Sequence, residues 1–147
     1  LLRNDLGRSC EEGSIRVEQL FGLESYKNVH HLVSTITGHL SPKITPIEAL
    51  KNAFPGGSIT GAPKIRAMEI INELEQTGRN AYCGNLFYAS DHGRLDSNIT
   101  IRTVLTDGDF VYCWGGGGIV ADSEPESEYA ESLNKIQIIL DTLTAMK

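Results

Sequence analysis

The clearest hydrophobic pattern lies in the last quarter of the chain. Apolar residues recur there at alternating spacings of four and three, the period of a helix with one buried face. The members of this stripe are Tyr129, Leu133, Ile136, Leu140 and Leu143. Ser123 with Glu126 three positions on is typical of a capping box, and Pro125 fits a first helical turn. The pattern predicts a long helix that begins just after Ser123 and closes the chain.

Two further helices are predicted earlier in the chain. Thr45 is followed by Pro46 and, three positions on, by Glu48, so a helix is expected to start there and to end before residues 55–57. A second helix is expected over residues 60–76, because its apolar residues repeat with a helical period. The residues expected to face inward from it are Ile65, Met68, Ile71 and Leu74.

Stretches rich in β-branched and aromatic residues predict the strands. They are residues 14–17, 21–26, 29–40, 81–90, 96–106 and 110–114. Turn residues at 91–93 and 107–108 are expected to join the last three strands as hairpins. Residues 1–8 are expected to be the end of a buried strand that enters a polar loop. Antiparallel strands with helices gathered on one side predict an α+β fold.

Composition and charge narrow the function classes. The chain has 147 residues, 40% of them hydrophobic and 22% charged, which suits one globular domain. Its net charge of −6 argues against nucleic acid as the main partner. No apolar stretch approaches the roughly 20 residues that span a bilayer, and no signal peptide is visible. Three cysteines, Cys10, Cys83 and Cys113, lack metal-ligand spacing, so a reduced, cytoplasmic setting is expected.

The strongest candidate site is a glycine run followed by charged helix positions. Residues 115–118 are four glycines, which expose bare backbone N–H groups that attract anions. Glu128, Glu131 and Lys135 follow at spacings that place them on one helix face, and carboxylates attract Mg²⁺. Together they suit a small anionic substrate held partly through a metal. The alternative is a solvated helix face with an ordinary Glu–Lys pair.

Two basic residues in a predicted first helical turn leave two interpretations open. Lys64 and Arg66 follow a glycine-rich loop that is not a Walker A loop, and cations there oppose the helix dipole. Either an anion lies near this helix end, or the two side chains pair with Glu69 and Glu73 or point to solvent.

Two further positions in predicted strands are equally open. Arg102 interrupts an alternating strand and is expected to share a face with Thr100, where it either binds a carboxylate or lies exposed. His30 and His31 are expected to point to opposite faces of their strand, one of them into a cleft or the core.

Taken together, these motifs resemble the chorismate-binding enzymes, which include anthranilate, aminodeoxychorismate, isochorismate and salicylate synthases. The motifs that carry the resemblance are residues 3–8 (Arg-Asn-Asp-Leu-Gly-Arg), 31–34, 54–64, 67–71, 99–103 and 116–123. Within the family, Phe-Pro-Gly-Gly-Ser-Ile-Thr-Gly-Ala-Pro-Lys at residues 54–64 is most similar to the aminodeoxychorismate synthase component I branch.

The resemblance implies a fold and a place in it. The family fold has two orthogonally packed antiparallel sheets with helices outside. Residues 1–147 would be the C-terminal segment of a single chorismate-binding domain, without its N-terminal part. Leu1 instead of an initiator Met agrees with a segment of a longer protein. Alone, such a segment is expected to expose apolar faces and to dimerise.

The resemblance also implies a reaction, the amination of chorismate at C4 to 4-amino-4-deoxychorismate for para-aminobenzoate and folate biosynthesis. A glutamine amidotransferase partner would supply the ammonia. The nucleophilic lysine belongs to a Pro-Ile-Lys-Gly motif that this sequence lacks, so no catalytic residue is expected within it and the segment alone is expected to be inactive. The alternatives are anthranilate synthase component I, which goes on to eliminate pyruvate, and a non-catalytic folding or interaction piece.

Site residues follow from the same resemblance. Glu128 and Glu131 resemble a pair that holds Mg²⁺, and the metal would clamp a substrate carboxylate. The residues implied to bind chorismate are His31, Thr60, Tyr82, Arg102, Gly116, Gly117, Gly118 and Lys135. Lys135 and Arg102 would bind carboxylates, whereas the glycines would offer N–H groups. His31 and Thr60 would line the ring and the leaving hydroxyl of chorismate, and Tyr82 would contact the enolpyruvyl side.

Overall fold

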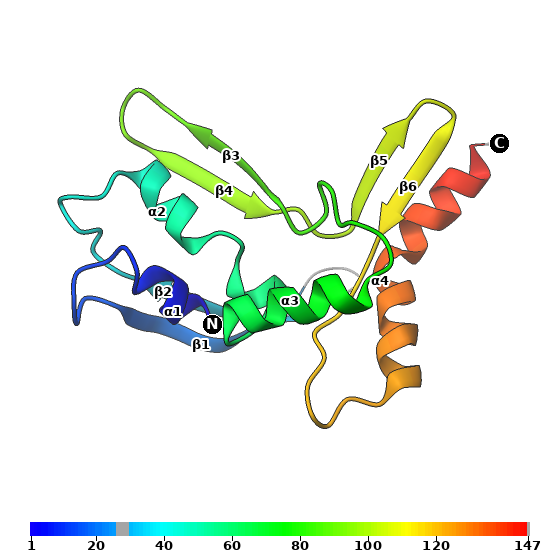
Figure 1. Ribbon diagram of the computed structural model, residues 1–147, viewed down its shortest axis with the longest axis horizontal. Coiled ribbons are helices and arrows are strands. Elements are labelled where there is room, and N and C mark those ends of the chain that lie inside the picture. The colour runs from blue at the N-terminus through cyan, green and yellow to red at the C-terminus, as the bar shows by residue number, and fades with distance from the viewer. Residues whose placement is uncertain (26–29, 147) are drawn as a thin grey trace. The chain divides into compact units, whose positions relative to one another are not determined.

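The computed structural model describes residues 1–25 and 30–146, and the side chain of His31 lies outside the described part. Helices alternate with small antiparallel sheets, which confirms the α+β class (Figure 1). The chain divides into two compact units, residues 1–71 with 89–95 and residues 72–88 with 96–147. Each unit is described by itself below. No helix in the described part is both long and apolar enough to cross a membrane.

The first unit opens with a short helix and a two-stranded sheet. Helix α1 spans Leu2–Leu6, so the strand end predicted for residues 1–8 is wrong. Strand β1 (Arg16–Ser25) pairs antiparallel with β2 (His30–Thr37). The two strands predicted over 14–17 and 21–26 are one strand, whose register shifts around Gln19 where the prediction placed a gap. The predicted strand ends at Tyr26 and Val29 lie outside the described residues.

The predicted helix after Thr45 is confirmed together with its cap. Helix α2 spans Pro46–Ala53, and the Thr45 hydroxyl accepts the Glu48 backbone N–H at 3.3 Å. In return the Glu48 carboxylate accepts the Thr45 backbone N–H at 2.8 Å. These hydrogen bonds hold the pKa of Glu48 below its ordinary value. Local sequence therefore fixed this helix start without help from distant residues.

The following glycine-rich segment contains a short 3₁₀ helix and then a longer α-helix. η1 spans Gly57–Ile59 and α3 spans Lys64–Leu74, so α3 starts four residues later than predicted. Gly61 has a φ of +140°, outside the helical region, and Pro63 disfavours a helical conformation at the residue before it. The residues from 60 to 63 are consequently a loop rather than a first helical turn.

The second unit contains most of two hairpins and the long closing helix (Figure 1). Strands β3 (Asn85–Ala89) and β4 (Leu95–Ile99) form one hairpin, and β5 (Thr103–Asp107) and β6 (Phe110–Trp114) form the other. Gly93 and Gly108 have φ values of +77° and +57°, so the predicted turns are confirmed. The single strand predicted over 96–106 is wrong, because the chain breaks between β4 and β5, where Arg102 has a φ of +50°.

Helix α4 spans Pro125–Ala145, as the hydrophobic period predicts, but its predicted cap is wrong. Glu124 occupies the cap position without a capping side-chain hydrogen bond. The Ser123 hydroxyl donates to the Glu128 carboxylate at 2.5 Å instead of receiving a first-turn N–H. From the predicted stripe Ile136 is buried, whereas Tyr129 is 67% exposed. Gly115 packs so closely on Ile136 that an added Cβ would lie 2.6 Å from its Cγ2.

Much of the apolar surface of this chain stays exposed. Ile65 and Leu74 of α3, predicted to face inward, are each 75% exposed, and Met68 is 42% exposed. A helix buries its apolar stripe only where another layer packs against it. The inward orientation predicted for Ile65, Met68 and Leu74 is therefore wrong for this chain taken alone, whereas Ile71 is half-buried.

Candidate functional site

The glycine run after β6 brings two predicted charged residues together. A Cβ added to Gly117 would lie 3.3 Å from Oε2 of Glu128 and 3.7 Å from Nζ of Lys135. Both side chains come from the first three turns of α4 and reach back to the glycine backbone. An opposite pair of charges therefore flanks bare backbone, which is the arrangement the sequence predicted for Gly117, Glu128 and Lys135.

The neighbouring glycine faces a different predicted residue. A Cβ on Gly116 would lie 2.5 Å from the Tyr82 hydroxyl, so a larger residue there would have to displace that hydroxyl. The Gly116 carbonyl also accepts a long hydrogen bond of 3.4 Å from Lys135 Nζ. Gly118 differs, because nothing described lies within 4 Å of a Cβ built on it. Two of the three glycines thus have close side-chain neighbours, and the third adjoins open space.

Each predicted metal-holding carboxylate already has a partner. Glu128 Oε1 accepts the Ser123 hydroxyl at 2.5 Å, and Ser123 in turn accepts the Val120 backbone N–H at 3.1 Å. Glu131 pairs with Lys135 at 2.5 Å, and its side chain is 57% exposed. The hydrogen bond from Ser123 leaves Glu128 Oε2 directed at Gly117. Ser123 was predicted only as a helix cap, so its contact with Glu128 is a feature that sequence reasoning missed.

These two carboxylates can form part of a metal site but not all of it. The described residues contain no cluster of three or more His, Cys, Asp or Glu side chains able to hold a metal ion. Mg²⁺ commonly takes one or two protein carboxylates and completes its shell with water and substrate oxygens. Glu128 and Glu131, one helical turn apart on α4, fit that limited role.

Tyr82 is held by a pair of residues that sequence reasoning missed. The Arg79 guanidinium donates to both oxygens of Glu75, at 2.8 and 2.6 Å, and lies 5.9 Å from the centre of the Tyr82 ring. Burial raises the pKa of the Tyr82 phenol and also that of the Cys83 thiol. A pocket of about 340 Å³ runs between these side chains and the glycines. Glu75 and Arg79 are four residues apart, and this i,i+4 spacing of opposite charges is the sequence signal that could have predicted the pair.

Arg102 does not lie where the sequence predicted. Thr100 is tied to the loop before β3, because its hydroxyl donates to the Ala81 carbonyl and its backbone N–H to the Gly84 carbonyl at 2.9 Å. The positive φ of Arg102 ends the alternation, so the shared face with Thr100 is wrong. The Arg102 side chain is exposed and pairs with no carboxylate among the described residues.

The first unit resolves the question of an anion near Lys64. Lys64 Nζ lies 2.6 Å from Oδ1 of Asp5 and donates to the Ala53 carbonyl at 2.9 Å. Its side chain is 8% exposed and that of Asp5 is 4% exposed. The anion is therefore a carboxylate of this chain, and sequence reasoning missed Asp5 as the partner of Lys64. Arg66, by contrast, pairs with Glu69 on the surface, as the alternative interpretation had it.

The remaining predicted residues also belong to the first unit. The Thr60 hydroxyl donates to the Gly56 carbonyl at 3.0 Å, and Thr60 is half-buried. The backbone of His31 pairs with Glu24 between β2 and β1, but its side chain lies outside the described part. The role predicted for His31 therefore stays a prediction.

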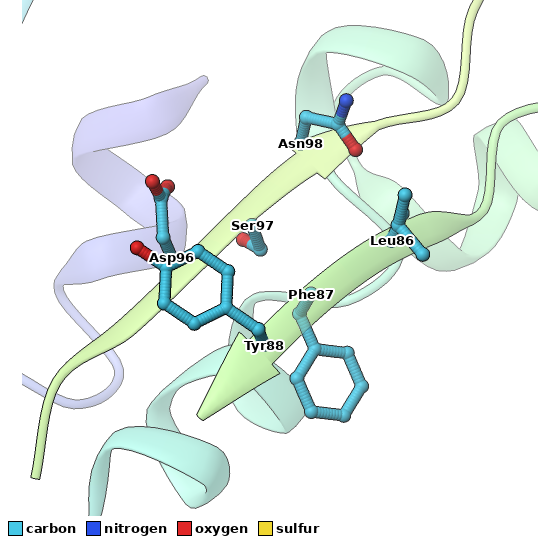
Figure 2. Close-up of a pocket in the computed structure, with 6 residues that line it drawn as sticks. All are labelled: Leu86, Phe87, Tyr88, Asp96, Ser97 and Asn98. Atoms are coloured by element: carbon cyan, nitrogen blue, oxygen red, sulfur yellow. The ribbon is translucent and has the colours of Figure 1, made fainter. Parts of the chain in front are cut away.

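One pocket lies away from every predicted residue. Figure 2 shows side chains of β3 and β4 around a pocket of about 400 Å³. It is lined by Leu86, Phe87, Tyr88, Asp96, Ser97 and Asn98. Phe87 and Tyr88 remain 49% and 64% exposed, so this is an open surface of the hairpin rather than an enclosed site.

Comparison with known proteins supplies the family. The sequence profile described as "chorismate binding enzyme" matches residues 1–141. Aminodeoxychorismate synthase component 1 of Klebsiella aerogenes is 54% identical over 143 residues, which cover 97% of this chain and 32% of that protein. Anthranilate synthase component 1 of Bacillus subtilis is 46% identical, with 97% of this chain and 28% of that protein covered. The chain thus spans about a third of the length of the curated relatives it matches.

Solved structures agree with the sequence comparison. Anthranilate synthase component I from Streptococcus pneumoniae superposes with a TM-score of 0.82 at 41% identity, over 92% of this chain and 31% of that one. A putative isochorismate synthase from Bacillus anthracis gives a TM-score of 0.83 at 26% identity, over 97% and 38% of the two chains. Sequence and fold therefore point the same way: the chain belongs to the family of chorismate binding enzymes.

Proposed function

We propose that this chain is part of an enzyme that aminates chorismate at C4. Relatives from Klebsiella aerogenes, Salmonella typhimurium and Escherichia coli, 52–54% identical, are named aminodeoxychorismate synthase component 1. The anthranilate synthase component 1 of Bacillus subtilis is less similar, at 46% identity. The observation that carries the proposal is the meeting of Glu128 and Lys135 at Gly117, because it places charged groups next to the open backbone of Gly118, where a dicarboxylate substrate could bind.

Lys135 and the glycines would bind the substrate carboxylates. The Lys135 ammonium lies against Gly116 and Gly117, so positive charge and backbone donors converge on one place. The open space at Gly118 leaves room for a ligand next to its backbone. Arg102, which is exposed, would bind a second carboxylate through its planar guanidinium.

Glu128 and Glu131 would hold Mg²⁺. The metal, when bound, would spread the negative charge of a substrate carboxylate. Ser123 would keep Glu128 in place, because its hydroxyl occupies one carboxylate oxygen and leaves the other directed at Gly117. Glu131 would have to exchange part of its contact with Lys135 for the metal, which its 57% exposure allows. Lys135 would then be released toward the substrate.

The remaining residues would act around the ring of the substrate. Tyr82 would contact the enolpyruvyl side through its hydroxyl beside Gly116. His31 and Thr60 would line the ring and the leaving hydroxyl. Chorismate would exchange its C4 hydroxyl for an amino group, so ammonia enters and water leaves. Ammonia would come from a glutamine amidotransferase subunit.

Lys64 does not suit the role of nucleophile in this reaction. Its side-chain nitrogen is buried and held by Asp5 and by the Ala53 carbonyl, so it is not free to approach a substrate carbon. We therefore assign the nucleophilic lysine to the Pro-Ile-Lys-Gly motif of the family, which this sequence does not contain.

A segment exchange tests this function. This chain replaces the matching 143 residues of the Klebsiella aerogenes relative, and the chimera is incubated with chorismate, Mg²⁺ and ammonia. We expect aminodeoxychorismate, and its loss in the same chimera with Glu131→Gln. The matching segment of the Bacillus subtilis relative serves as a folding control. A folded chimera that makes no product while the Klebsiella aerogenes parent does would refute the proposal.

A further inference from the structure

We propose that Asp5 and Lys64 are positioning residues that fix the loop 56–63 and, through it, Thr60 for substrate binding. The inference rests on the proposed function, because Thr60 is assigned to chorismate there. It goes further by giving a role to a buried ion pair that touches no predicted ligand.

The contacts join three segments of the first unit. Asp5 in α1 contacts Lys64 through Oδ1 at 2.6 Å and accepts the Gly57 backbone N–H through Oδ2 at 2.7 Å. Lys64, at the start of α3, also donates to the carbonyl of Ala53 at the end of α2. The pair is therefore bonded to both ends of the segment that links α2 to α3.

A short chain of hydrogen bonds runs from Asp5 to Thr60. Once Gly57 is fixed by Asp5, its carbonyl accepts the Thr60 backbone N–H at 3.4 Å. The carbonyl of the preceding Gly56 accepts the Thr60 hydroxyl at 3.0 Å. Gly57 itself has no spare room, because an added Cβ would lie 3.0 Å from Oδ2 of Asp5. The position of the Thr60 hydroxyl thus depends on where Asp5 holds the loop.

The charge of the pair argues for a role beyond stability. Removing two charges from water costs free energy, and apolar residues of similar volume often serve a buried position equally well or better. An apolar pair, however, has no acceptor for the Gly57 N–H. The carboxylate supplies that acceptor, and Lys64 keeps the carboxylate ionised, since contact with both outweighs burial and lowers the pKa of Asp5.

Two double variants of the natural protein that contains this chain separate positioning from packing. Asp5→Asn with Lys64→Met removes both charges but keeps an amide oxygen that accepts the Gly57 N–H. Asp5→Leu with Lys64→Met removes both charges and the acceptor. If the leucine variant fails to fold, Asp5→Ser with Lys64→Met replaces it. The serine hydroxyl at position 5 is too short to reach the Gly57 N–H.

The readout is the dissociation constant of chorismate, measured by titration well below the melting temperature of each variant. We expect the asparagine variant to bind within about threefold of the parent. The leucine or serine variant should bind chorismate at least about tenfold more weakly, which is a loss of about 1.4 kcal/mol of binding free energy. Equal chorismate affinity in the parent, the asparagine variant and the leucine or serine variant would overturn the inference.

A double-mutant cycle adds a readout that a merely structural role would not move. If Asp5 acts through Thr60, the leucine variant should lose little further affinity in a Thr60→Val background. Losses that simply add would contradict the proposal.

Ser9 and Asn52, joined by a 3.1 Å hydrogen bond in the same unit, give the matched control. Ser9→Ala with Asn52→Ala should lower the melting temperature and leave chorismate affinity unchanged. A parent protein that does not bind chorismate would instead refute the proposed function.

Discussion

Replacing Lys64 alone by methionine should destabilise the protein strongly. The change removes the ammonium but leaves the Asp5 carboxylate, 4% exposed, without its counter-charge. Removal of one partner from a buried pair typically costs about 3–5 kcal/mol. Arg66→Met on the same helix is the matched control, because the Arg66–Glu69 pair is 56% and 54% exposed. An exposed pair of this kind contributes about 0.2–1 kcal/mol.

Urea denaturation followed by circular dichroism measures both variants. With a urea m-value of about 1–3 kcal/mol/M, Lys64→Met should lower the midpoint by at least about 1 M, and Arg66→Met by a few tenths of that. Equal shifts for the two variants would show that the Asp5–Lys64 pair is no more important than a surface pair. That outcome would also remove the basis for a fixed loop at residues 56–63.

The pH dependence gives a second check on the same pair. Burial alone would raise the pKa of Asp5, but Lys64 and the Gly57 N–H outweigh it, so the folded-state pKa lies below the ordinary 3.8. A lowered carboxyl pKa contributes stability above pH 3.8 that is lost as the pH falls through the folded-state value. In Lys64→Met, protonation of Asp5 instead relieves a buried charge. The gap between parent and variant should therefore narrow as the pH falls from 7 toward 4, and a constant gap would contradict this reasoning.

Three further predictions concern the second unit. In the natural protein that contains this chain, Glu131→Gln should weaken activation by Mg²⁺ at least about tenfold, the loss typical of a disturbed metal-binding network, whereas Glu126→Gln in the first turn of α4 should not. Equal Mg²⁺ activation curves for the two variants would leave Glu131 a surface residue. Arg102→Lys should raise the KM for chorismate about tenfold or more, because lysine cannot form two parallel hydrogen bonds to a carboxylate; an unchanged KM would remove Arg102 from the site. Burial raises the pKa of Cys83, which is 8% exposed, so a thiol reagent at neutral pH should modify it more slowly than Cys113. Equal modification rates for Cys83 and Cys113, measured by mass spectrometry of the peptides, would argue against a buried environment that raises the pKa of Cys83.

Local signals in the sequence predicted local structure well. The capping box of Thr45 and Glu48 needs only neighbouring residues, and the structure confirms it. The glycine run and the charged face of α4 lie close along the chain, so helical spacing sufficed to bring Glu128 and Lys135 to Gly117. The turns at Gly93 and Gly108 were likewise predictable, since each requires a positive φ.

The failures come from interactions between distant residues. Ser123 satisfies the local pattern of a cap, but its hydroxyl donates a hydrogen bond of 2.5 Å to the Glu128 carboxylate instead of accepting one from a first-turn N–H. Asp5 and Lys64 are far apart in the sequence, and no periodicity relates them. The break before β5 depends on Thr100, which is held by the loop at Ala81 and Gly84 rather than by its own strand. Pattern alone cannot rank such competing partners.

The identity of the nitrogen-containing product distinguishes C4 amination of chorismate from its alternatives. The natural protein that contains this chain is incubated with chorismate, Mg²⁺ and ¹⁵N-labelled ammonia, and the products are identified by mass spectrometry. The account predicts labelled 4-amino-4-deoxychorismate that retains its enolpyruvyl group, with no release of pyruvate. Labelled anthranilate with an equal amount of pyruvate, or chorismate recovered without any label, would contradict it.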